Sequence, residues 1–373
     1  MRVAIDITPL AAVPTGIARS ISELLQGFAS LPDAPEMIPY AISTRALRNR
    51  SVLPLGTRII PGAATLASLW GRFDHPRIDH RIRGAELLHA TNYLIPPSKL
   101  PTLATINDCS PVRHPSLCSD AVRAVVPSLR RAIDRGAHVH VPSEFVAQEV
   151  EELFGPGLGR AGRIHVVPYG VPALPASGGL TTELAAFGPI ANGMPFVLAV
   201  GTLEPRKNLA HLVSAFGEVA TTQPELHLVL AGPDGPARPE IDAVVKRLPS
   251  SVAPRVVLTG AVTEASKAWL LRHARALAYP SVYEGFGFPL LEAMSAGTPV
   301  LGARAGSIPE VVGPAAELVD PTDEAAMAAA LVRLVTDDSH RNELVRLGTE
   351  RIATYSWTRC ATSIAALYRT LAR

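Results

Sequence analysis

Cysteine is scarce in this sequence: 373 residues contain only Cys109, Cys118 and Cys360. They are widely spaced and odd in number, so they make neither a zinc-binding pattern nor a disulfide framework, and a reducing cytoplasm is the expected compartment. Long apolar runs are missing too, because no stretch approaches the roughly 18 residues that a membrane helix needs. Any membrane contact is therefore expected to be peripheral, at the inner face.

The net charge is also small, +2 at pH 7, which excludes the strong basic excess typical of nucleic-acid-binding proteins. Its distribution is uneven. Residues 1–175 hold 18 Lys and Arg against 14 Asp and Glu, an excess of four, with arginines clustered at 45–50 and 72–83. Such clusters usually lie on a solvated surface, and contact with anionic lipid or an acceptor is the alternative.

Short β-branched and aliphatic runs alternate with longer amphipathic segments, which is the pattern of parallel sheets with crossover helices. In the first half this alternation predicts strands at 3–7, 87–90, 102–106, 139–141 and 164–167. It predicts helices that end near residue 25, cover 121–135 and begin after Ser143, which is a suitable N-cap.

Residues 168–195 are dense in proline and glycine and predict a linker. A second alternation follows, with strands at 196–200, 226–230, 256–259, 277–279 and 300–302 and helices from Leu209, Glu240, Glu264 and Pro289. The predicted fold class is α/β, with two doubly wound units and a last amphipathic helix. Ligands of such sheets bind beyond the carboxyl ends of the strands, so the turns there are where chemistry is expected.

The first such turn of the second half reads Gly-Thr-Leu-Glu-Pro-Arg-Lys-Asn at 201–208. Gly201 permits a tight exit from the strand, and Arg206 and Lys207 lie just before a helix. Lys207 is one of only four lysines in the chain. A cationic pair here would neutralise a diphosphate leaving group, whose charge grows in the transition state. The alternative is an exposed loop with two solvated charges.

A second turn, at 279–292, combines two glycines with two carboxylates. Gly285 and Gly287 let a ligand approach the backbone, and Pro289 suits the first residue of a helix, whose free N–H groups would hold a phosphate. Glu284 before this helix and Glu292 within about its first turn would border one pocket and accept from sugar or ribose hydroxyls. Alternatively, the glycines only make a turn and Glu292 only complements the helix dipole.

Two further strand-end turns, at 231–235 and 259–263, are rich in glycine. Their glycines would allow a flat base to lie against the backbone, although each turn is equally consistent with an ordinary strand-to-helix connection. Glu310, in a similar segment at 302–310, is interpreted as structural.

The order of these motifs resembles that of the retaining nucleotide-sugar glycosyltransferases of family four, which have the GT-B fold. The resemblance rests on the run at 201–208, on the Glu-x7-Glu element from Glu284 to Glu292, and on Glu-Ala-Met-Ser-Ala-Gly-Thr-Pro-Val at 292–300. With further similar stretches at 14–19, 88–92, 141–145 and 167–171, it covers nearly the whole chain.

The resemblance implies two Rossmann-like domains that face each other across a cleft. Residues 1–175 would bind the acceptor, residues 176–355 would bind the nucleotide-sugar, and a helix within 356–373 would return to the first domain.

The resemblance also implies roles for individual residues. Glu284 would contact the donor sugar, Glu292 the ribose and Lys207 the diphosphate. Gly16 would belong to a loop over the donor phosphates. The remaining donor-binding residues implied are Thr202, Arg206, Val262, Gly285, Phe286, Gly287, Phe288 and Leu290.

Two positions depart from the family pattern. Many members have arginine directly after the first-turn glycine, where this chain has Thr202, so Arg206 would supply the second cation. Many also have His-Asp where this chain has Asn107 and Asp108. Asparagine cannot exchange protons as histidine can, but an amide suffices if the position only orients the donor sugar. The residues with expected catalytic roles are Glu284, Lys207, Asn107 and Asp108.

The predicted reaction is retaining transfer of a sugar from a nucleotide-sugar to a saccharide or polyprenyl-linked saccharide in surface polysaccharide synthesis. Similarity to bacterial polysaccharide mannosyltransferases favours GDP-mannose as the donor, with UDP-sugars open. No metal or other cofactor is expected, because the chain has neither Asp-x-Asp nor a cluster of His and Cys ligands.

Three other functions are alternatives to this prediction. One is a nucleotide-sugar epimerase of the same architecture. Another is a non-catalytic sugar-nucleotide-binding subunit, which the two departures motivate. A dehydrogenase is the weakest, because the first strand leads into Pro-Thr-Gly-Ile-Ala-Arg and not into a full G-x-G-x-x-G.

Overall fold

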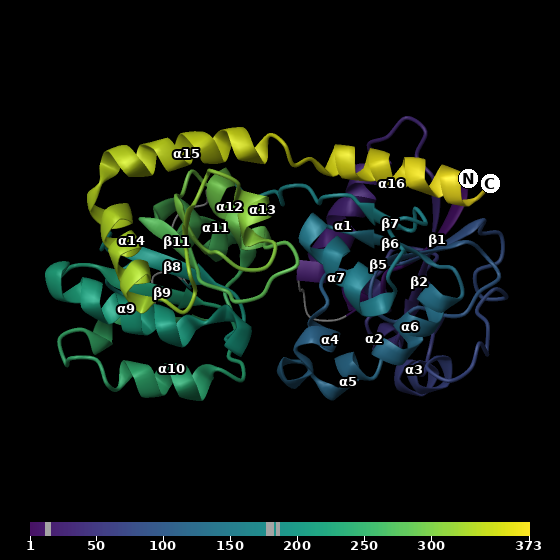
Figure 1. Ribbon diagram of the computed structural model, residues 1–373, viewed down its shortest axis with the longest axis horizontal. Coiled ribbons are helices and arrows are strands. Elements are labelled where there is room, and N and C mark those ends of the chain that lie inside the picture. Colours follow the sequence, from purple (N-terminus) through teal and green to yellow (C-terminus); the bar gives the residue numbers. More distant parts are fainter. Residues whose placement is uncertain (12–15, 177–182, 184–186) are drawn as a thin grey trace. The chain divides into compact units, whose positions relative to one another are not determined.

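The structure, a computed structural model, describes residues 1–11, 16–176, 183 and 187–373. These residues divide into two compact units, which we call unit 1 (1–170 and 355–373) and unit 2 (171–354). Each unit has a parallel β-sheet with helices packed on it (Figure 1). The predicted α/β class with two doubly wound sheets is therefore confirmed.

Unit 1 contains, in its described part, a seven-stranded sheet of order β3-β2-β1-β4-β5-β6-β7. The strands are β1 (Arg2–Asp6), β2 (Glu36–Ile42), β3 (Arg58–Ile60), β4 (Leu87–Ala90), β5 (Thr102–Thr105), β6 (His138–Val141) and β7 (Ile164–Val166). The α-helices are α1 (Gly16–Ala29), α2 (Arg45–Arg48), α3 (Ala63–Trp70), α4 (Ser110–Arg113), α5 (Asp120–Arg123), α6 (Val126–Asp134), α7 (Glu144–Phe154) and α16 (Trp357–Leu371). Short 3-10 helices are η1 (Thr8–Ala11), η2 (Arg50–Val52) and η3 (Pro115–Leu117).

Strands β2 and β3 were not predicted, and Pro39 in the middle of β2 explains why β2 was missed. Proline cannot donate to a sheet and normally argues against an internal strand. Glu36 donates to Met1 and Tyr40 accepts from Ile7, so even-numbered residues of β2 bond β1. The nitrogen of Pro39 faces the other side, where pairing with β3 begins only at Tyr40. The missing N–H therefore removes no bond from the sheet.

The single helix predicted over 121–135 is wrong, because the structure breaks it into α5 and α6. Pro127 is the cause. It lacks the N–H that would bond the carbonyl of Arg123 four residues earlier, and it is well suited to the first turn of a new helix. Ser143 caps α7 as predicted, since its side chain accepts from the N–H of Val146.

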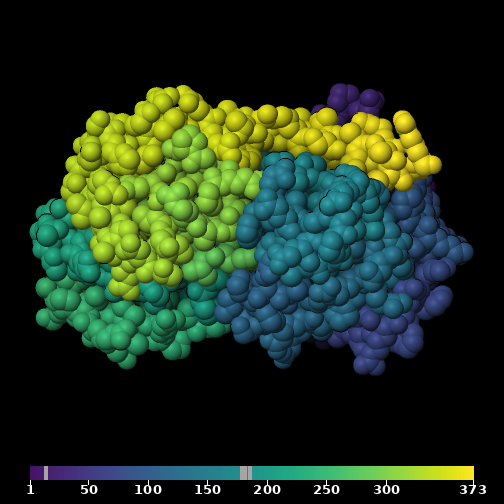
Figure 2. Space-filling view, viewed as in Figure 1, coloured from purple at the N-terminus to yellow at the C-terminus, as the bar shows by residue number. Residues whose placement is uncertain are grey.

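The C-terminal helix α16 packs against α1, which confirms the predicted return of this helix to the first domain. The rings of Phe28 and Tyr368 lie 5.7 Å apart between centroids. A Cβ on Gly27 would lie 2.9 Å from the carbonyl oxygen of Trp357, so only glycine lets α1 approach this closely. Figure 2 shows the yellow C-terminal residues lying against the surface formed by much earlier residues of unit 1.

A buried chain of polar side chains crosses the sheet of unit 1 beneath α16. The hydroxyl of Tyr368 lies 2.6 Å from His89 Nδ1, and Thr105 Oγ1 lies 2.8 Å from His89 Nε2. His140 Nδ1 is 2.9 Å from the same Thr105 oxygen, and its Nε2 is 2.9 Å from the carbonyl oxygen of Val167. Helix α16 is therefore joined to β4, β5 and β6 by polar contacts as well as by apolar packing.

Unit 2 contains, within the described residues, a six-stranded sheet of order β10-β9-β8-β11-β12-β13. The strands are β8 (Phe196–Val200), β9 (His227–Ala231), β10 (Val256–Gly260), β11 (Ala276–Tyr279), β12 (Val300–Ala303) and β13 (Glu317–Val319). The helices are η4 (Pro205–Lys207), α9 (Leu209–Thr222), α10 (Arg238–Val245), η5 (Ala253–Arg255), α11 (Glu264–His273), α12 (Phe288–Ser295), α13 (Ile308–Val312), α14 (Glu324–Thr336) and α15 (Asp338–Ile352). All but β13 of these strands were predicted.

The strand order of unit 2 reverses between β8 and β11, which are adjacent and parallel. Both strands are buried and apolar, so they form the centre of the sheet. Their carboxyl ends flank the crevice where such sheets bind ligands. The turns after these two strands are two of the strand-end turns where the sequence predicted chemistry, and they are the two that carry the predicted cations and carboxylates.

Candidate functional site

The turns after β8 and β11 are joined through their backbones, since the N–H of Val282 donates to the carbonyl of Arg206 at 2.8 Å. Asn208 ends the first turn in the left-handed conformation, with a φ of 56°, which asparagine tolerates better than most residues. Its side-chain amide donates to the carbonyl of Pro321 at 2.7 Å. These bonds fix the turn and present Lys207 to the second one.

Lys207 is buried at the centre of the site. Its Nζ donates to Glu284 Oε1 and to the hydroxyl of Tyr279, each at 2.6 Å, and lies 4.5 Å from the centroid of the Tyr279 ring. Only 8% of Lys207 and 7% of Glu284 are exposed. The two predicted site residues therefore form a buried ion pair, and Tyr279 is a partner that the sequence analysis missed.

Arg206 adds a second cation to the same carboxylate. Its Nη1 lies 2.8 Å from Glu284 Oε1, and its Nε lies 2.8 Å from Glu204 Oε2. Burial alone would raise the pKa of Glu284, but Lys207 and Arg206 outweigh it and lower the pKa to about 2. Glu284 is therefore ionised at neutral pH. Burial lowers the pKa of Lys207, an effect that Glu284 opposes.

The backbone of Glu284 is held by the turn after β12. The N–H of Ser307 donates to the carbonyl of Glu284 at 3.0 Å. Gly306 has a φ of 58°, and a Cβ there would lie 2.8 Å from both the nitrogen and the oxygen of Glu284. Glycine is thus required for this close approach. The sequence did not predict that this turn contacts Glu284. It predicted only a structural role for Glu310 in the same segment.

Glu292 lies on α12 and is 2% exposed. Its Oε1 accepts from Lys267 Nζ at 2.9 Å, and the same ammonium lies 3.0 Å from Glu264 Oε2. Lys267, on α11, was not among the predicted site residues. The scarcity of lysine that singled out Lys207 applies equally to Lys267 and was the available signal.

Helix α12 begins at Phe288, so Pro289 is its second residue and not its first as predicted. Gly287 precedes it with a φ of 92°, and the rings of Phe286 and Phe288 meet edge to face at 5.4 Å. The N–H of Leu290 already donates to the carbonyl of Gly287 at 3.1 Å. A phosphate bound at this helix start would share or replace that bond.

The glycines at 231–235 serve packing between turns. A Cβ on Gly232 would lie 2.0 Å from the carbonyl oxygen of Gly201, and one on Gly235 would lie 2.5 Å from that of Leu203. Glycine is therefore needed here for the approach of the 201–208 turn. Thr202 is part of this contact and Val262 lies in the turn between β10 and α11; both are half-buried.

The predicted site residues of unit 1 follow β5. Asn107 Oδ1 accepts from the hydroxyl of Tyr169 at 2.6 Å. Asp108 Oδ1 accepts from the hydroxyl of Tyr93 at 2.9 Å and from the N–H of Ser110 at 2.8 Å. Both side chains are thus held in fixed orientations.

The predicted loop before α1 is only partly described. Gly16 is the exposed first residue of that helix. Pro14 and Thr15 lie outside the described residues.

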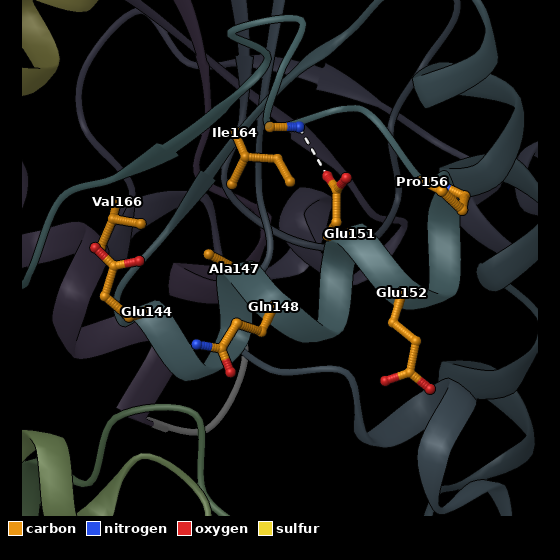
Figure 3. Close-up of a pocket in the computed structure, with 9 residues that line it drawn as sticks. Glu144, Ala147, Gln148, Glu151, Glu152, Pro156, Ile164 and Val166 are labelled. Atoms are coloured by element: carbon orange, nitrogen blue, oxygen red, sulfur yellow. Dashed lines mark hydrogen bonds between the residues drawn. The ribbon is translucent and has the colours of Figure 1, made fainter.

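A surface hollow of about 470 Å³ lies between α7 and β7 in unit 1 (Figure 3). Three glutamates, Glu144, Glu151 and Glu152, line it. Figure 3 shows the carboxylate of Glu151 turned toward a backbone nitrogen, that of Gly159, which donates to it at 2.7 Å. Acidic walls repel a diphosphate, and none of the predicted donor-binding residues lines this hollow, so it is not the donor site.

Comparison with known proteins identifies the family. The sequence model described as "Glycosyl transferases group 1" matches residues 194–337, which include both turns of the site. The O-antigen chain mannosyltransferase B of Escherichia coli is 29% identical over 306 residues, which are 76% of this chain and 74% of that protein. The chain is a group 1 glycosyltransferase with the GT-B fold. The predicted membership of family four is thereby confirmed.

Two further proteins, one similar in sequence and one similar in structure, are informative. The MMP alpha-(1->4)-mannosyltransferase of Mycolicibacterium hassiacum is 32% identical over 219 residues, 55% of this chain and 48% of that protein. HepE of Anabaena, solved in complex with UDP and glucose, superposes with a TM-score of 0.76 at 17% identity, covering 99% of this chain and all of that one. The superposition supports the fold.

Among the described residues of the glycosyltransferase, no three His, Cys, Asp or Glu side chains are grouped as metal ligands would be. In the same part of the chain, no helix has both the length and the apolar character that crossing a bilayer requires.

Proposed function

We propose that this glycosyltransferase transfers mannose from GDP-mannose to a saccharide or polyprenyl-linked saccharide acceptor, with retention of configuration, in surface polysaccharide synthesis. The observation that carries the proposal is the buried cluster of Lys207, Arg206 and Glu284 at the switch point of unit 2. Lys207 and Arg206 bring two cations to one turn, where the carboxylates of Glu284 and Glu204 pair with them. A diphosphate bound there would meet two cationic hydrogen-bond donors that are already held in place.

In the proposed reaction, Lys207 and Arg206 stabilise the diphosphate as the bond to the sugar breaks. Departure and acceptor attack occur on the same face of the sugar, so charge stabilisation matters more than a strong enzymic base. Glu284 is ionised and accepts hydrogen bonds from sugar hydroxyls. The fixed turn geometry means that these groups need little rearrangement when charge develops.

Other residues complete the proposed donor site. Glu292 accepts from the ribose hydroxyls, and Lys267 holds its carboxylate in place through an ion pair. The backbone near Phe288 and Leu290 meets the phosphates at the positive end of α12. Asn107 and Asp108 of unit 1 orient the substrates. The other donor contacts proposed are Gly16, Thr202, Val262, Gly285, Phe286 and Gly287.

Mannose is proposed because the two sequence relatives named above are mannosyltransferases by name. GDP is proposed because the resemblance to bacterial polysaccharide mannosyltransferases favours GDP-mannose as the donor. The test is a thermal-shift screen of nucleotide-sugars, followed by transfer assays with the best ligand. GDP-mannose should raise the melting temperature more than UDP-glucose, and mannose should pass to a saccharide acceptor. A preference for a UDP-sugar would overturn the donor assignment.

The same assay separates the alternatives. An epimerase would convert the donor sugar without an acceptor. A non-catalytic subunit would bind the donor but neither transfer nor hydrolyse it. Either outcome would overturn the transferase proposal.

We also propose that unit 1 touches an anionic membrane surface through residues 45–55, where a polyprenyl-linked acceptor would lie. Residues 37–73 contain five arginines and no Asp or Glu. Within 45–55 the exposed basic and aliphatic side chains are Arg45, Arg48, Arg50, Leu47, Val52 and Leu55. Apolar side chains interleaved with cations match a bilayer with anionic headgroups.

Vesicle sedimentation tests this surface. The protein should sediment with vesicles containing phosphatidylglycerol and stay in solution with phosphatidylcholine alone. Replacing Leu47, Val52 and Leu55 by serine should abolish sedimentation while transfer to a water-soluble acceptor persists. Leu117→Ser, at an exposed leucine elsewhere in unit 1, is the control. Equal binding of the triple variant and the control would refute this surface.

A further inference from the structure

Only one of the two polar atoms in the Asn107 side chain has a hydrogen-bond partner among the described residues. Its Oδ1 accepts from the hydroxyl of Tyr169 at 2.6 Å. Its Nδ2 is buried and has no hydrogen-bond partner among the described residues. Buried polar atoms in folded proteins are almost always partnered, and Asn107 is itself a predicted catalytic residue, so its unpartnered amide donor is suited to bind a substrate.

The hydroxyl of Tyr169 donates to this amide and so favours one of its two orientations. An asparagine amide can turn by 180°, which exchanges its donor and acceptor atoms. A hydroxyl that donates keeps Oδ1 on its own side and holds the two N–H donors of Nδ2 on the other. Without that bond, both orientations would be populated and the donors would face the ligand only part of the time.

Tyr169 lies at the end of the first segment of unit 1, where neighbouring side chains hold its ring. It is buried, its ring lies 5.6 Å from that of Trp357, and it meets His140 edge to face at 5.8 Å. A Cβ on the next residue, Gly170, would lie 2.3 Å from the backbone nitrogen of Trp357. The chain leaves unit 1 after Gly170 and returns to it at Tyr355. Residues next to both connections, Gly170 and Trp357, therefore pack together around the Tyr169 ring.

We propose that Tyr169 is a positioning residue for the transfer reaction, which acts by holding Nδ2 of Asn107 toward a substrate oxygen. Asparagine thereby supplies a fixed N–H donor where many relatives have histidine. Trp357 and Gly170 keep the phenol in place. This inference rests on the proposed function, because Asn107 has a role only if the chain binds and transfers a sugar.

A double-mutant cycle tests the proposal. Tyr169→Phe should lower kcat roughly 3- to 10-fold, the size of one neutral hydrogen bond, with a smaller change in the KM of the donor. In an Asn107→Ala background the same change should have no further effect. Tyr40→Phe is the matched control, because the Tyr40 hydroxyl is also buried in unit 1 but has no partner among the described residues.

Two results would overturn the inference. One is a Tyr169→Phe variant as active as the Tyr40→Phe control. The other is an equal loss in the Asn107→Ala background, which would mean that Tyr169 acts on structure and not through Asn107. Both variants are assayed well below their melting temperatures, so that a loss of stability does not imitate a loss of positioning.

A second measurement separates this inference from the proposed function. The side-chain amide signals of Asn107 in an ¹⁵N-labelled protein are assigned by their loss in Asn107→Ala. They should shift or broaden in Tyr169→Phe and stay unchanged in Tyr40→Phe, whether or not a donor is turned over. Unchanged signals in Tyr169→Phe would refute the orientation argument, whereas a wild-type protein inactive with every donor would refute only the transfer.

Discussion

Replacing Lys207 by methionine is the most direct test of the donor site. Methionine keeps most of the volume of the lysine side chain but removes the ammonium that bonds Glu284 and Tyr279, each at 2.6 Å. Arg206 remains 2.8 Å from the same Glu284 oxygen, so one cation of the cluster survives. The variant therefore measures what the buried ammonium adds to transfer.

The expected size of the effect follows from the setting of this ammonium. A single group that stabilises developing charge in a buried site contributes about 2 to 4 kcal/mol to the transition state. At about 1.4 kcal/mol for each factor of ten, kcat/KM should fall roughly 30- to 1,000-fold. Because Lys207 lowers the pKa of Glu284, its loss should also raise that pKa and move the acid limb of the pH profile upward.

The assay is initial-rate transfer with saturating acceptor between pH 5 and 9. Lys246→Met serves as the control, because Lys246 is an exposed lysine of the same unit. Circular dichroism and the melting temperature check that both variants are folded. A Lys207→Met variant that is folded and transfers as fast as Lys246→Met would refute the assignment of the leaving-group site.

Three other outcomes are expected. Glu284→Gln should abolish measurable transfer in a folded protein, since a neutral amide neither accepts as strongly nor pairs with the two cations; retained turnover would contradict its role. Lys267→Met should raise the KM of the donor more than it lowers kcat, because Lys267 holds the Glu292 carboxylate that is proposed to bind the ribose and does not contact the reacting bond. An effect on kcat alone would contradict this role of Lys267. Burial lowers the pKa of His89 to about 3 and that of His140 to about 4, so stability should be lost as pH falls below 6.5, by about 2 kcal/mol for each histidine at pH 5. Asp6, whose pKa burial raises to about 6, offsets part of this loss. Urea unfolding at pH 7 and 5 measures this loss of stability. A His89→Gln variant whose free energy of unfolding has the same pH dependence as that of the wild type would contradict the effect assigned to His89.

Much of the fold could be predicted because the strands that form the sheet centres are short, apolar and separated by clear helical patterns. Strand β2 could not, since Pro39 argues against an internal strand until the register shows which way its nitrogen faces. The break between α5 and α6 could have been predicted from Pro127, because its effect on the carbonyl four residues earlier is purely local.

The site could be predicted less completely. Lys207 and Glu284 stand out in the sequence, but their contact depends on the adjacency of β8 and β11, which strand order alone decides. Lys267 was visible only as a rare lysine, with nothing in the sequence to pair it with Glu292. The bond from Tyr169 to Asn107 spans 62 residues and arises from the fold of unit 1, so no local pattern indicates it.

The split of unit 1 between the two ends of the chain has a consequence for biosynthesis. Unit 2 is continuous, so all of its residues leave the ribosome before α16 does. Until then, the face of α1 that receives α16 is uncovered and His89 lacks the Tyr368 hydroxyl. Unit 1 is therefore completed only after the whole of unit 2 has been made, although its first strands are made earliest.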